Sequence, residues 1–320
     1  MKKDISWIYL AHLGYNMWYE PLEDKMGIHC PEAGSDLCRY VHATHKLRFE
    51  DDYWQELTAQ LREAGCDTIL LDIGEGLRFE THPELAIEGS WSKQKLADEL
   101  DRLRAMGFEV LPKLNFSACH DEWLGEYGRM VSTSVYYKAV QELIEETAEL
   151  FGNPRLFHLG FDEETAHHQQ HNNYMVIRQG EQWWYDLNKI VGFTEAAGSR
   201  AWIWSDYGWG HWEEFKANMS KEIVQSNWYY NDFKREEPHL TYMALYDKLE
   251  EAGFDQIPTG SGWALAENFP LTVEYCGERI APERLLGYMQ SVWNPTMREA
   301  RQRHDISVAA MKQAIGVYRK

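Results

Sequence analysis

The chain has 320 residues, and its 44% hydrophobic and 26% charged residues are typical of a soluble globular protein. Its formal net charge is −19 and no basic tract occurs, which excludes a surface built to bind the phosphates of nucleic acids or of anionic membranes. No apolar run approaches the roughly 20 residues of a membrane span.

Residues 1–4 are briefly basic, but the apolar stretch behind them is short and is interrupted by His12 and Asn16. No small-residue cleavage site follows, so we interpret this start as a strand and not as a signal peptide. This predicts a cytoplasmic protein, or one from which a signal has been removed.

Short apolar segments alternate with longer amphipathic segments along the chain, which predicts a parallel sheet covered by helices. The predicted strands are 7–15, 68–74, 109–116, 155–162, 200–206, 223–228, 256–261 and 285–293. The predicted helices are 51–64, 92–106, 134–151, 180–197, 212–218, 241–252, 271–280 and 297–318. The expected helix C-caps are Gly65, Gly107 and Gly253, and the expected N-caps are Ser92, Ser134 and Thr241.

Eight strands that are each followed by a helix predict an α/β fold, a closed (β/α)8 TIM barrel that forms a single domain over residues 1–320. An open doubly wound sheet is the alternative, but no glycine-rich phosphate loop follows the first strand. Residues from about 19 to 46 have little periodicity, so we expect a long loop after the first strand.

The fourth predicted strand ends in the sequence His158-Leu159-Gly160-Phe161-Asp162-Glu163. Alternation along a strand turns the first, third and fifth of these residues toward the barrel axis and the second and fourth toward the helices. Active sites of such barrels lie at the carboxyl ends of the strands. Two adjacent acids raise each other's pKa, so that one of them can serve as an acid while the other stays ionised. The alternative is an acid-rich surface loop.

This motif resembles the His-x-Gly-Gly-Asp-Glu signature of family 20 glycoside hydrolases, the β-N-acetylhexosaminidases. Four further strand ends are similar to that family's motifs in the same order: 109–115 with His120, 202–206, 224–228 and 286–293. The resemblance covers about residues 48–293, and it implies the same barrel and an exo-acting enzyme on a carbohydrate substrate, without cofactor or metal.

The resemblance also implies a substrate-assisted, retaining mechanism. Glu163 would protonate the leaving oxygen, and Asp162 would orient the 2-acetamido group as it attacks the anomeric carbon, so that no carboxylate nucleophile is needed. His120 would support the two acids. The aromatic residues expected to bind the sugar are Trp204, Trp228, Trp263 and Trp293.

Several positions depart from the family's pattern and mark a divergent member. Phe161 stands where the family has a small residue, Lys113 and Asn115 replace two acids of the third strand, and Asn294 replaces a sugar-binding Glu. The first strand lacks the substrate-binding Arg, unless Arg48 is its displaced equivalent.

The seventh strand lacks the Tyr that binds the acetamido oxygen in the family. Tyr207 or Tyr229 is a candidate substitute.

Three other acids are candidates for binding sugar hydroxyls or for acting with Glu163 in a two-carboxylate hydrolysis. Asp72 and Glu75 follow the second strand, where a capped turn with an ion pair to Arg78 is the alternative reading. Asp206 follows Trp204 on the barrel-facing phase of the fifth strand.

The five cysteines are odd in number and scattered, which indicates free thiols in a reducing compartment. A zinc site in the first loop is the alternative, but the spacing of its histidines and cysteines does not match structural zinc motifs. Those residues are His29, Cys30, Cys38, His42 and His45. Cys119, beside His120, suggests a thiol nucleophile that nothing else in the sequence supports.

Three functions therefore stay open: an N-acetylhexosaminidase, a glycosidase on a plain sugar that uses Glu163 with another carboxylate, and a carbohydrate-binding barrel without catalysis.

Overall fold

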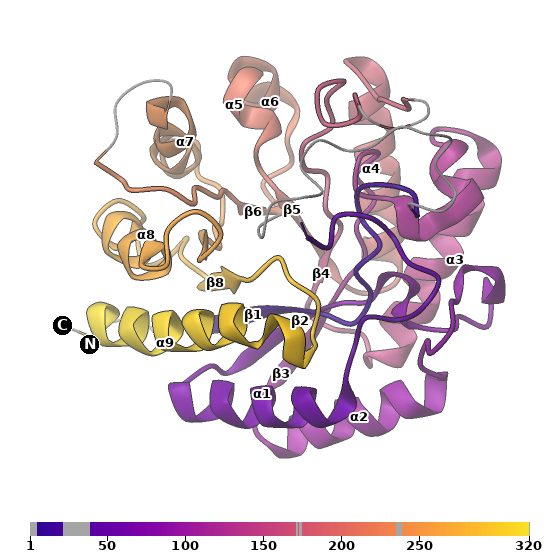
Figure 1. Cartoon of the computed structure of the whole chain (residues 1–320). Coiled ribbons are helices and arrows are strands. Elements are labelled where there is room, and N and C mark those ends of the chain that lie inside the picture. The colour runs from indigo at the N-terminus through magenta and orange to yellow at the C-terminus, as the bar shows by residue number, and fades with distance from the viewer. Residues whose placement is uncertain (1–4, 22–38, 171, 173–174, 235–238, 320) are drawn as a thin grey trace.

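The computed structural model describes residues 5–21, 39–170, 172, 175–234 and 239–319. Eight parallel strands lie in the order β6-β5-β4-β3-β2-β1-β8-β7 (Figure 1). Isolated bridges between Gln225 and Gln256 and between Trp228 and Thr259 connect β6 to β7. The predicted barrel is confirmed. Its strands are β1 Ser6–His12, β2 Thr68–Asp72, β3 Glu109–Lys113, β4 Leu156–His158, β5 Arg200–Trp204, β6 Val224–Ser226, β7 Thr259–Ser261 and β8 Gly287–Ser291.

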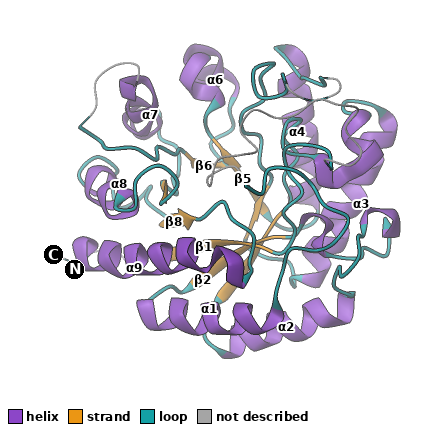
Figure 2. Cartoon of the chain, viewed as in Figure 1, coloured by secondary structure: helices purple, strands orange, loops and turns teal. Residues whose placement is uncertain are grey.

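Helices surround the strands on the outside of the barrel (Figure 2). They are α1 Asp51–Ala64, α2 Lys93–Ala105, α3 Ser134–Leu150, α4 Glu181–Ala196, α5 Tyr207–Gly210, α6 Trp212–Asn218, α7 His239–Glu251, α8 Asn268–Gly277 and α9 Arg301–Tyr318. Each predicted helix is present within a few residues of its expected bounds. No helix in the described part of the chain is both long and apolar enough to cross a membrane.

The helix ends confirm most of the predicted caps. The expected C-terminal glycines have left-handed backbone, with φ of 97°, 88° and 80° at Gly65, Gly107 and Gly253. Ser92 accepts a hydrogen bond from the Lys95 amide at 3.2 Å, as an N-cap does. Two predictions are wrong. Thr133, and not Ser134, caps α3, and Thr241 lies inside α7.

The core has two layers, because strand residues alternate between two faces. In β1, Trp7 and Tyr9 belong to the layer between strands and helices, whereas Ile8 and Leu10 lie inside the barrel. The inner layer is closed by large side chains of the later strands, among them Trp202. This packed interior leaves the barrel mouth as the place for a site.

Three of the five cysteines are described, and all three, Cys66, Cys119 and Cys276, are buried free thiols. The candidate metal ligands His29, Cys30 and Cys38 lie outside the described residues. Among the described residues, no cluster of His, Cys, Asp and Glu has the arrangement of a metal site.

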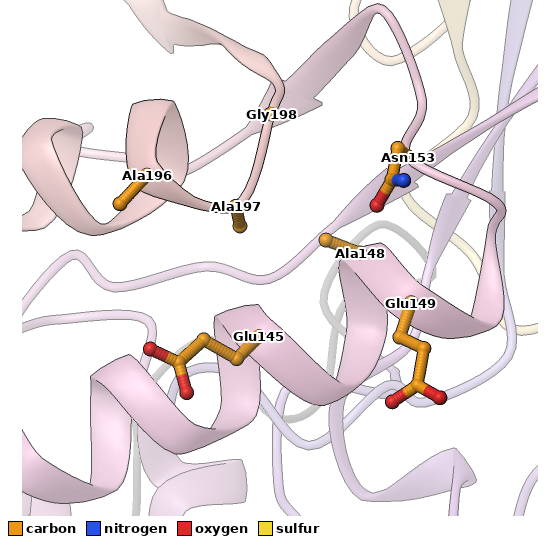
Figure 3. Close-up of a pocket in the computed structure, with 7 residues that line it drawn as sticks. All are labelled: Glu145, Ala148, Glu149, Asn153, Ala196, Ala197 and Gly198. Carbon is orange, nitrogen blue, oxygen red and sulfur yellow. The ribbon is translucent and has the colours of Figure 1, made fainter.

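A surface hollow lies where α3 and α4 end (Figure 3). These helices lead into β4 and β5, so the hollow is at the amino ends of the strands, opposite the barrel mouth. Its lining contains two carboxylates and no aromatic ring: Glu145, Ala148, Glu149, Asn153, Ala196, Ala197 and Gly198. It lacks the rings that a sugar site needs.

Candidate active site

The two adjacent acids lie on a distorted segment after β4. The strand ends at His158, and the backbone φ is then positive at Gly160 (79°), Phe161 (70°) and Glu163 (55°). Non-glycine residues rarely adopt this conformation, and it concentrates at functional sites. Asp162 is buried, and the Glu163 side chain is a quarter exposed.

Phe161 anchors this segment from the helix side. Its ring meets Trp183 of α4 edge-on at 5.7 Å between centroids, and the Arg178 guanidinium lies 4.8 Å from its centroid. Arg178 is itself buried in ion pairs with Glu164 and Asp186. Leu159 and Phe161 therefore face the helices as predicted, and the bulky Phe161 packs away from the acids.

His120 joins the two acids. Its Nδ1 lies 3.1 Å from Oδ2 of Asp162, and its Nε2 lies 3.2 Å from Oε2 of Glu163. Burial is the largest single influence and lowers the pKa of His120, but the contacts with Asp162 and Cys119 together outweigh burial and raise this pKa well above its usual value. An imidazolium thus lies between two carboxylates.

Glu163 has a second histidine partner, His168, whose Nε2 lies 3.5 Å from Oε1. Burial acts to raise the pKa of Glu163, but the contacts with His120 and His168 outweigh burial and lower this pKa. The carboxyl of Glu163 is therefore ionised when the site is empty.

Polar residues after β3 hold the acids in place. The amide of Asn115 donates to Oδ1 of Asp162 at 3.2 Å, and the Ser117 hydroxyl donates to the Asp162 carbonyl. The thiol of Cys119 donates to the Glu163 carbonyl at 2.9 Å. Burial raises the pKa of this thiol to about 12, so Cys119 serves as a hydrogen-bond donor and not as a nucleophile.

Asp206, just after β5, approaches the acids from the other side. Its Oδ2 accepts the Glu163 backbone N–H at 2.8 Å. Its Oδ1 is buried and has no hydrogen-bond partner among the described residues. Burial, with the nearby charge of Asp162, raises the pKa of Asp206 to about 7. Oδ1 of Asp206 can therefore accept a hydrogen bond from a ligand hydroxyl.

Aromatic rings form one wall of the mouth. Trp293 has a positive φ of 51°, and its Nε1 donates to the hydroxyl of Tyr230 at 3.2 Å. Trp228 stacks on Tyr230 with 5.0 Å between centroids, and Trp204 lies buried 5.9 Å from Trp293. Trp18, from the loop after β1, lies 6.4 Å from Trp293.

No protein-family model and no curated protein sequence matches this chain. Among solved structures, the chain is similar to Dispersin B, with a TM-score of 0.60 and 12% identity over 85% of this chain and 96% of that chain. It is also similar to the family 20 β-N-acetylhexosaminidase of Streptomyces coelicolor, with a TM-score of 0.59 and 11% identity over 96% and 64% of the two chains. The fold is that of the family 20 catalytic barrel.

A third similar structure is the family 20 exo-β-N-acetylglucosaminidase of Vibrio harveyi, with a TM-score of 0.62 and 10% identity. The match covers 98% of this chain and 54% of that enzyme. The chain thus spans nearly all of Dispersin B, but less than two thirds of the Streptomyces and Vibrio enzymes.

Within this barrel, Asp72 lies below the acids and not beside them. Its Oδ2 is 2.5 Å from Nζ of Lys113 and 3.3 Å from Nδ1 of His12, and all three side chains are buried. Burial is the largest single influence and acts to raise the pKa of Asp72, but the contacts with Lys113 and His12 together outweigh burial and lower it. The expected role of Asp72 as a sugar ligand or nucleophile conflicts with this ion pair.

Glu75 and Arg48 lie beneath the loop that follows β1. Oε1 of Glu75 accepts the backbone N–H groups of Tyr15 and Asn16 at 2.7 and 3.0 Å. Arg48 donates to the Tyr15 carbonyl at 2.9 Å. Both side chains thus bind the loop's backbone, and a contact of either one with sugar stays a prediction. Trp263 is partly buried in the loop after β7.

The structure brings Tyr230 to the mouth of the barrel in place of the expected tyrosines. The hydroxyl of Tyr229 donates to the Asp232 carbonyl at 3.3 Å and its ring packs on Phe233, outside the barrel. Tyr207 stacks on Trp183, also outside. The sequence contained the signal, because residues 228 and 230 share one face of an extended segment. For Trp18 we find no comparable signal.

Proposed function

We propose that this protein is a glycoside hydrolase that removes a terminal N-acetylhexosamine by substrate-assisted catalysis. The observation that carries the proposal is the contact of one imidazole, that of His120, with both Asp162 and Glu163 at the mouth of a family 20 barrel.

Asp162 is suited to orient the acetamido group. Asn115 and His120 each bind one of its carboxylate oxygens, so its position is defined before substrate binds. The Asp162 side chain accepts the substrate's amide N–H, and the acetamido carbonyl oxygen then attacks the anomeric carbon. A preorganised acceptor of this kind stabilises the charge that develops in the transition state.

Glu163 is suited to transfer the proton. It must carry a proton when the glycosidic bond breaks, and Nε2 of His120, its ion-pair partner, lies 3.2 Å from its Oε2 and is the nearby source of that proton. Transfer of this proton neutralises both groups, and Glu163 then protonates the leaving oxygen. Afterwards the Glu163 carboxylate takes a proton from the water that opens the cyclic intermediate, and passing this proton back to Nε2 of His120 restores the starting state.

The neighbouring acids favour substrate assistance over a carboxylate nucleophile. Asp72 is neutralised by Lys113, and Glu75 binds two backbone amides. Asp206 and Glu75 each have a buried carboxylate oxygen without a hydrogen-bond partner among the described residues, but of these two acids it is Asp206 that contacts Glu163, through its backbone N–H. A second candidate function therefore remains, in which Glu163 and Asp206 hydrolyse a sugar without an acetamido group.

Hydrolysis of a panel of nitrophenyl β-glycosides tests the proposal. The panel contains N-acetylglucosaminide, N-acetylgalactosaminide, glucoside and galactoside, each with and without an N-acetylglucosamine thiazoline. Hydrolysis of only the acetamido sugars, inhibited by the thiazoline, supports substrate assistance. Hydrolysis of the plain sugars that Asp206→Asn abolishes supports the second candidate. No hydrolysis and no thiazoline binding contradicts the first.

A further inference from the structure

Trp18 occupies the rim of the mouth between two strands that bear site residues. Its ring lies 5.8 Å from the imidazole of His120, at an interplanar angle of 90°, and 6.4 Å from the ring of Trp293. His120 follows β3 and Trp293 follows β8, so Trp18 bridges the end of the barrel at which β1 emerges. The ring is partly buried.

The backbone just before Trp18 is held by two charged side chains. Oε1 of Glu75 accepts the N–H groups of Tyr15 and Asn16. Nη2 of Arg48 donates to the Tyr15 carbonyl at 2.9 Å and to Oδ1 of Asn16 at 3.2 Å. The two backbone N–H groups and the Tyr15 carbonyl of this segment are therefore held by side chains that are distant in the sequence.

The backbone after Trp18 is held by the segment 40–44. The amide of Tyr19 donates to the Val41 carbonyl at 3.2 Å, and the amide of Ala43 donates to the Tyr19 carbonyl at 2.8 Å. Nη1 of Arg48 donates to the Tyr40 carbonyl at 2.9 Å, so the same guanidinium joins both supports. Trp18 therefore lies between two fixed points.

A glycine allows the loop to approach Glu75 this closely. A Cβ atom on Gly14 would lie 2.5 Å from the Ile73 carbonyl oxygen and 2.6 Å from Oε2 of Glu75, distances at which atoms clash. Glu75 is 3% exposed, and burying a carboxylate is costly unless it is fully hydrogen-bonded. Burial of the Glu75 carboxylate therefore costs free energy, and its hydrogen bonds to the backbone fix the conformation of the loop after β1.

We propose that Trp18 is a sugar-binding ring of this active site and that Arg48 and Glu75 are positioning residues that hold it there. The inference rests on the proposed function and adds to it a contact with the sugar whose bond is cleaved. An indole ring beside His120 and Trp293 covers the apolar C–H face of a pyranose, as aromatic rings do in sugar sites.

The first experiment measures the dissociation constant of the N-acetylglucosamine thiazoline, which fills only the terminal sugar site, by calorimetry. Trp18→Ala is expected to weaken binding by about 10-fold and Trp18→Phe by less, because a smaller ring covers less of the sugar. Tyr185→Ala, which removes an exposed ring on α4, is the matched control and leaves binding unchanged. Unchanged binding by Trp18→Ala would overturn the inference.

A double-mutant cycle tests the positioning role. A lysine cannot donate to Tyr40, Tyr15 and Asn16 from one planar group, so Arg48→Lys is expected to weaken thiazoline binding in the same direction as Trp18→Ala. If Arg48 acts through Trp18, the double variant Arg48→Lys with Trp18→Ala binds the thiazoline almost as tightly as Trp18→Ala alone. Fully additive losses would show that Arg48 acts independently and would overturn this role.

Two further measurements keep the outcomes separate. Asn16→Ala removes the hydrogen bond between Arg48 and the Asn16 side chain, while Arg48 and Glu75 both remain. This variant replaces Arg48→Lys if Arg48→Lys does not fold. If the protein cleaves plain β-glycosides and does not bind the thiazoline, the proposed function fails, and the same variants are compared by KM on the cleaved glycoside. A KM that rises with little change in kcat supports Trp18 as a binding ring, and an unchanged KM refutes it.

Discussion

A Cβ atom on Gly160 would lie only 1.8 Å from Oδ1 of Asn115. The absence of a side chain at Gly160 is therefore what lets the Asn115 amide lie beside the acid segment and bind Asp162. The backbone of Gly160, with φ of 79°, is also one that side chains disfavour. The glycine at this strand end is required for two independent reasons.

Gly160→Ala is expected to displace Asn115, to misplace Asp162 and to reduce kcat/KM by about 100-fold or more, since small displacements of catalytic groups have effects of that size. It also destabilises the fold by more than about 1 kcal/mol, because of the strained φ. Enzyme kinetics and urea unfolding check both values.

Gly192→Ala is the matched control, because nothing lies within 4 Å of a Cβ at this position in α4. It is expected to leave activity unchanged and to stabilise the helix by about 0.5–1 kcal/mol. If Gly160→Ala and Gly192→Ala have the same kcat/KM and the same free energy of unfolding, the role of Gly160 is contradicted.

Glu163→Gln removes the transferable proton and keeps the shape of the side chain. We expect hydrolysis to fall by about 10²- to 10⁴-fold, the usual contribution of general acid–base catalysis, while the thiazoline still binds. Glu181→Gln, an exposed position at the start of α4, is the control. Undiminished hydrolysis by Glu163→Gln would rule out Glu163 as the acid, and a wild-type protein that binds sugars without hydrolysing any would be a binding barrel.

The buried pair of Lys113 and Asp72 is expected to be sensitive to removal of either partner. Asp72→Asn leaves an unpaired ammonium inside the barrel and should cost about 3–5 kcal/mol of the free energy of unfolding. The double variant Asp72→Leu with Lys113→Met should recover most of that loss, because it removes both charges. Chemical denaturation measures the three proteins, and a loss of less than 1 kcal/mol in the single variant, roughly the value of a surface pair, would contradict burial of the charge.

Asp206 is expected to make stability depend on pH. Its pKa is raised from the usual 3.8 to about 7, so between these values the folded protein holds a proton that the unfolded chain releases. The free energy of unfolding therefore falls as pH rises through this window, and Asp206→Asn removes that contribution.

Denaturation near pH 5 and near pH 8 checks this expectation. The loss of stability between the two pH values should be smaller in Asp206→Asn than in the wild type, by on the order of 1 kcal/mol. Titrating groups remote from Asp206 contribute equally to both proteins and cancel in the comparison. An identical loss in the two proteins would show that the pKa of Asp206 is not raised.

Much of the fold was predictable because its signals are local. The two-residue period of the strands and the helical period of the segments between them predicted each strand and every α-helix of the described residues except the short α5. Alternation also oriented Phe161 toward the helices, where it packs on Trp183. The prediction of helix caps was least accurate where two neighbouring residues could both serve as the N-cap. At the start of α3, Thr133 forms the cap instead of Ser134.

Alternation was not enough for the aromatic wall. The sequence placed Tyr229 in the site, but its neighbour Tyr230 makes the contact with Trp293. A two-residue period tells which residues share a face, but it does not tell which face is turned inward after a strand has ended. Trp18 was missed because it lies on an irregular loop, where no period exists.

The sequence by itself determined the barrel and the place of Asp162 and Glu163 at the end of its fourth strand, since hydrophobic period and strand order follow from neighbouring residues. Only the tertiary structure decided which partner each charge has. Asp72 meets Lys113, and His120 meets both acids. These pairs join segments from different strands, and whether a carboxylate binds a ligand, a lysine or a backbone amide depends on which segments closure of the barrel brings within hydrogen-bonding distance.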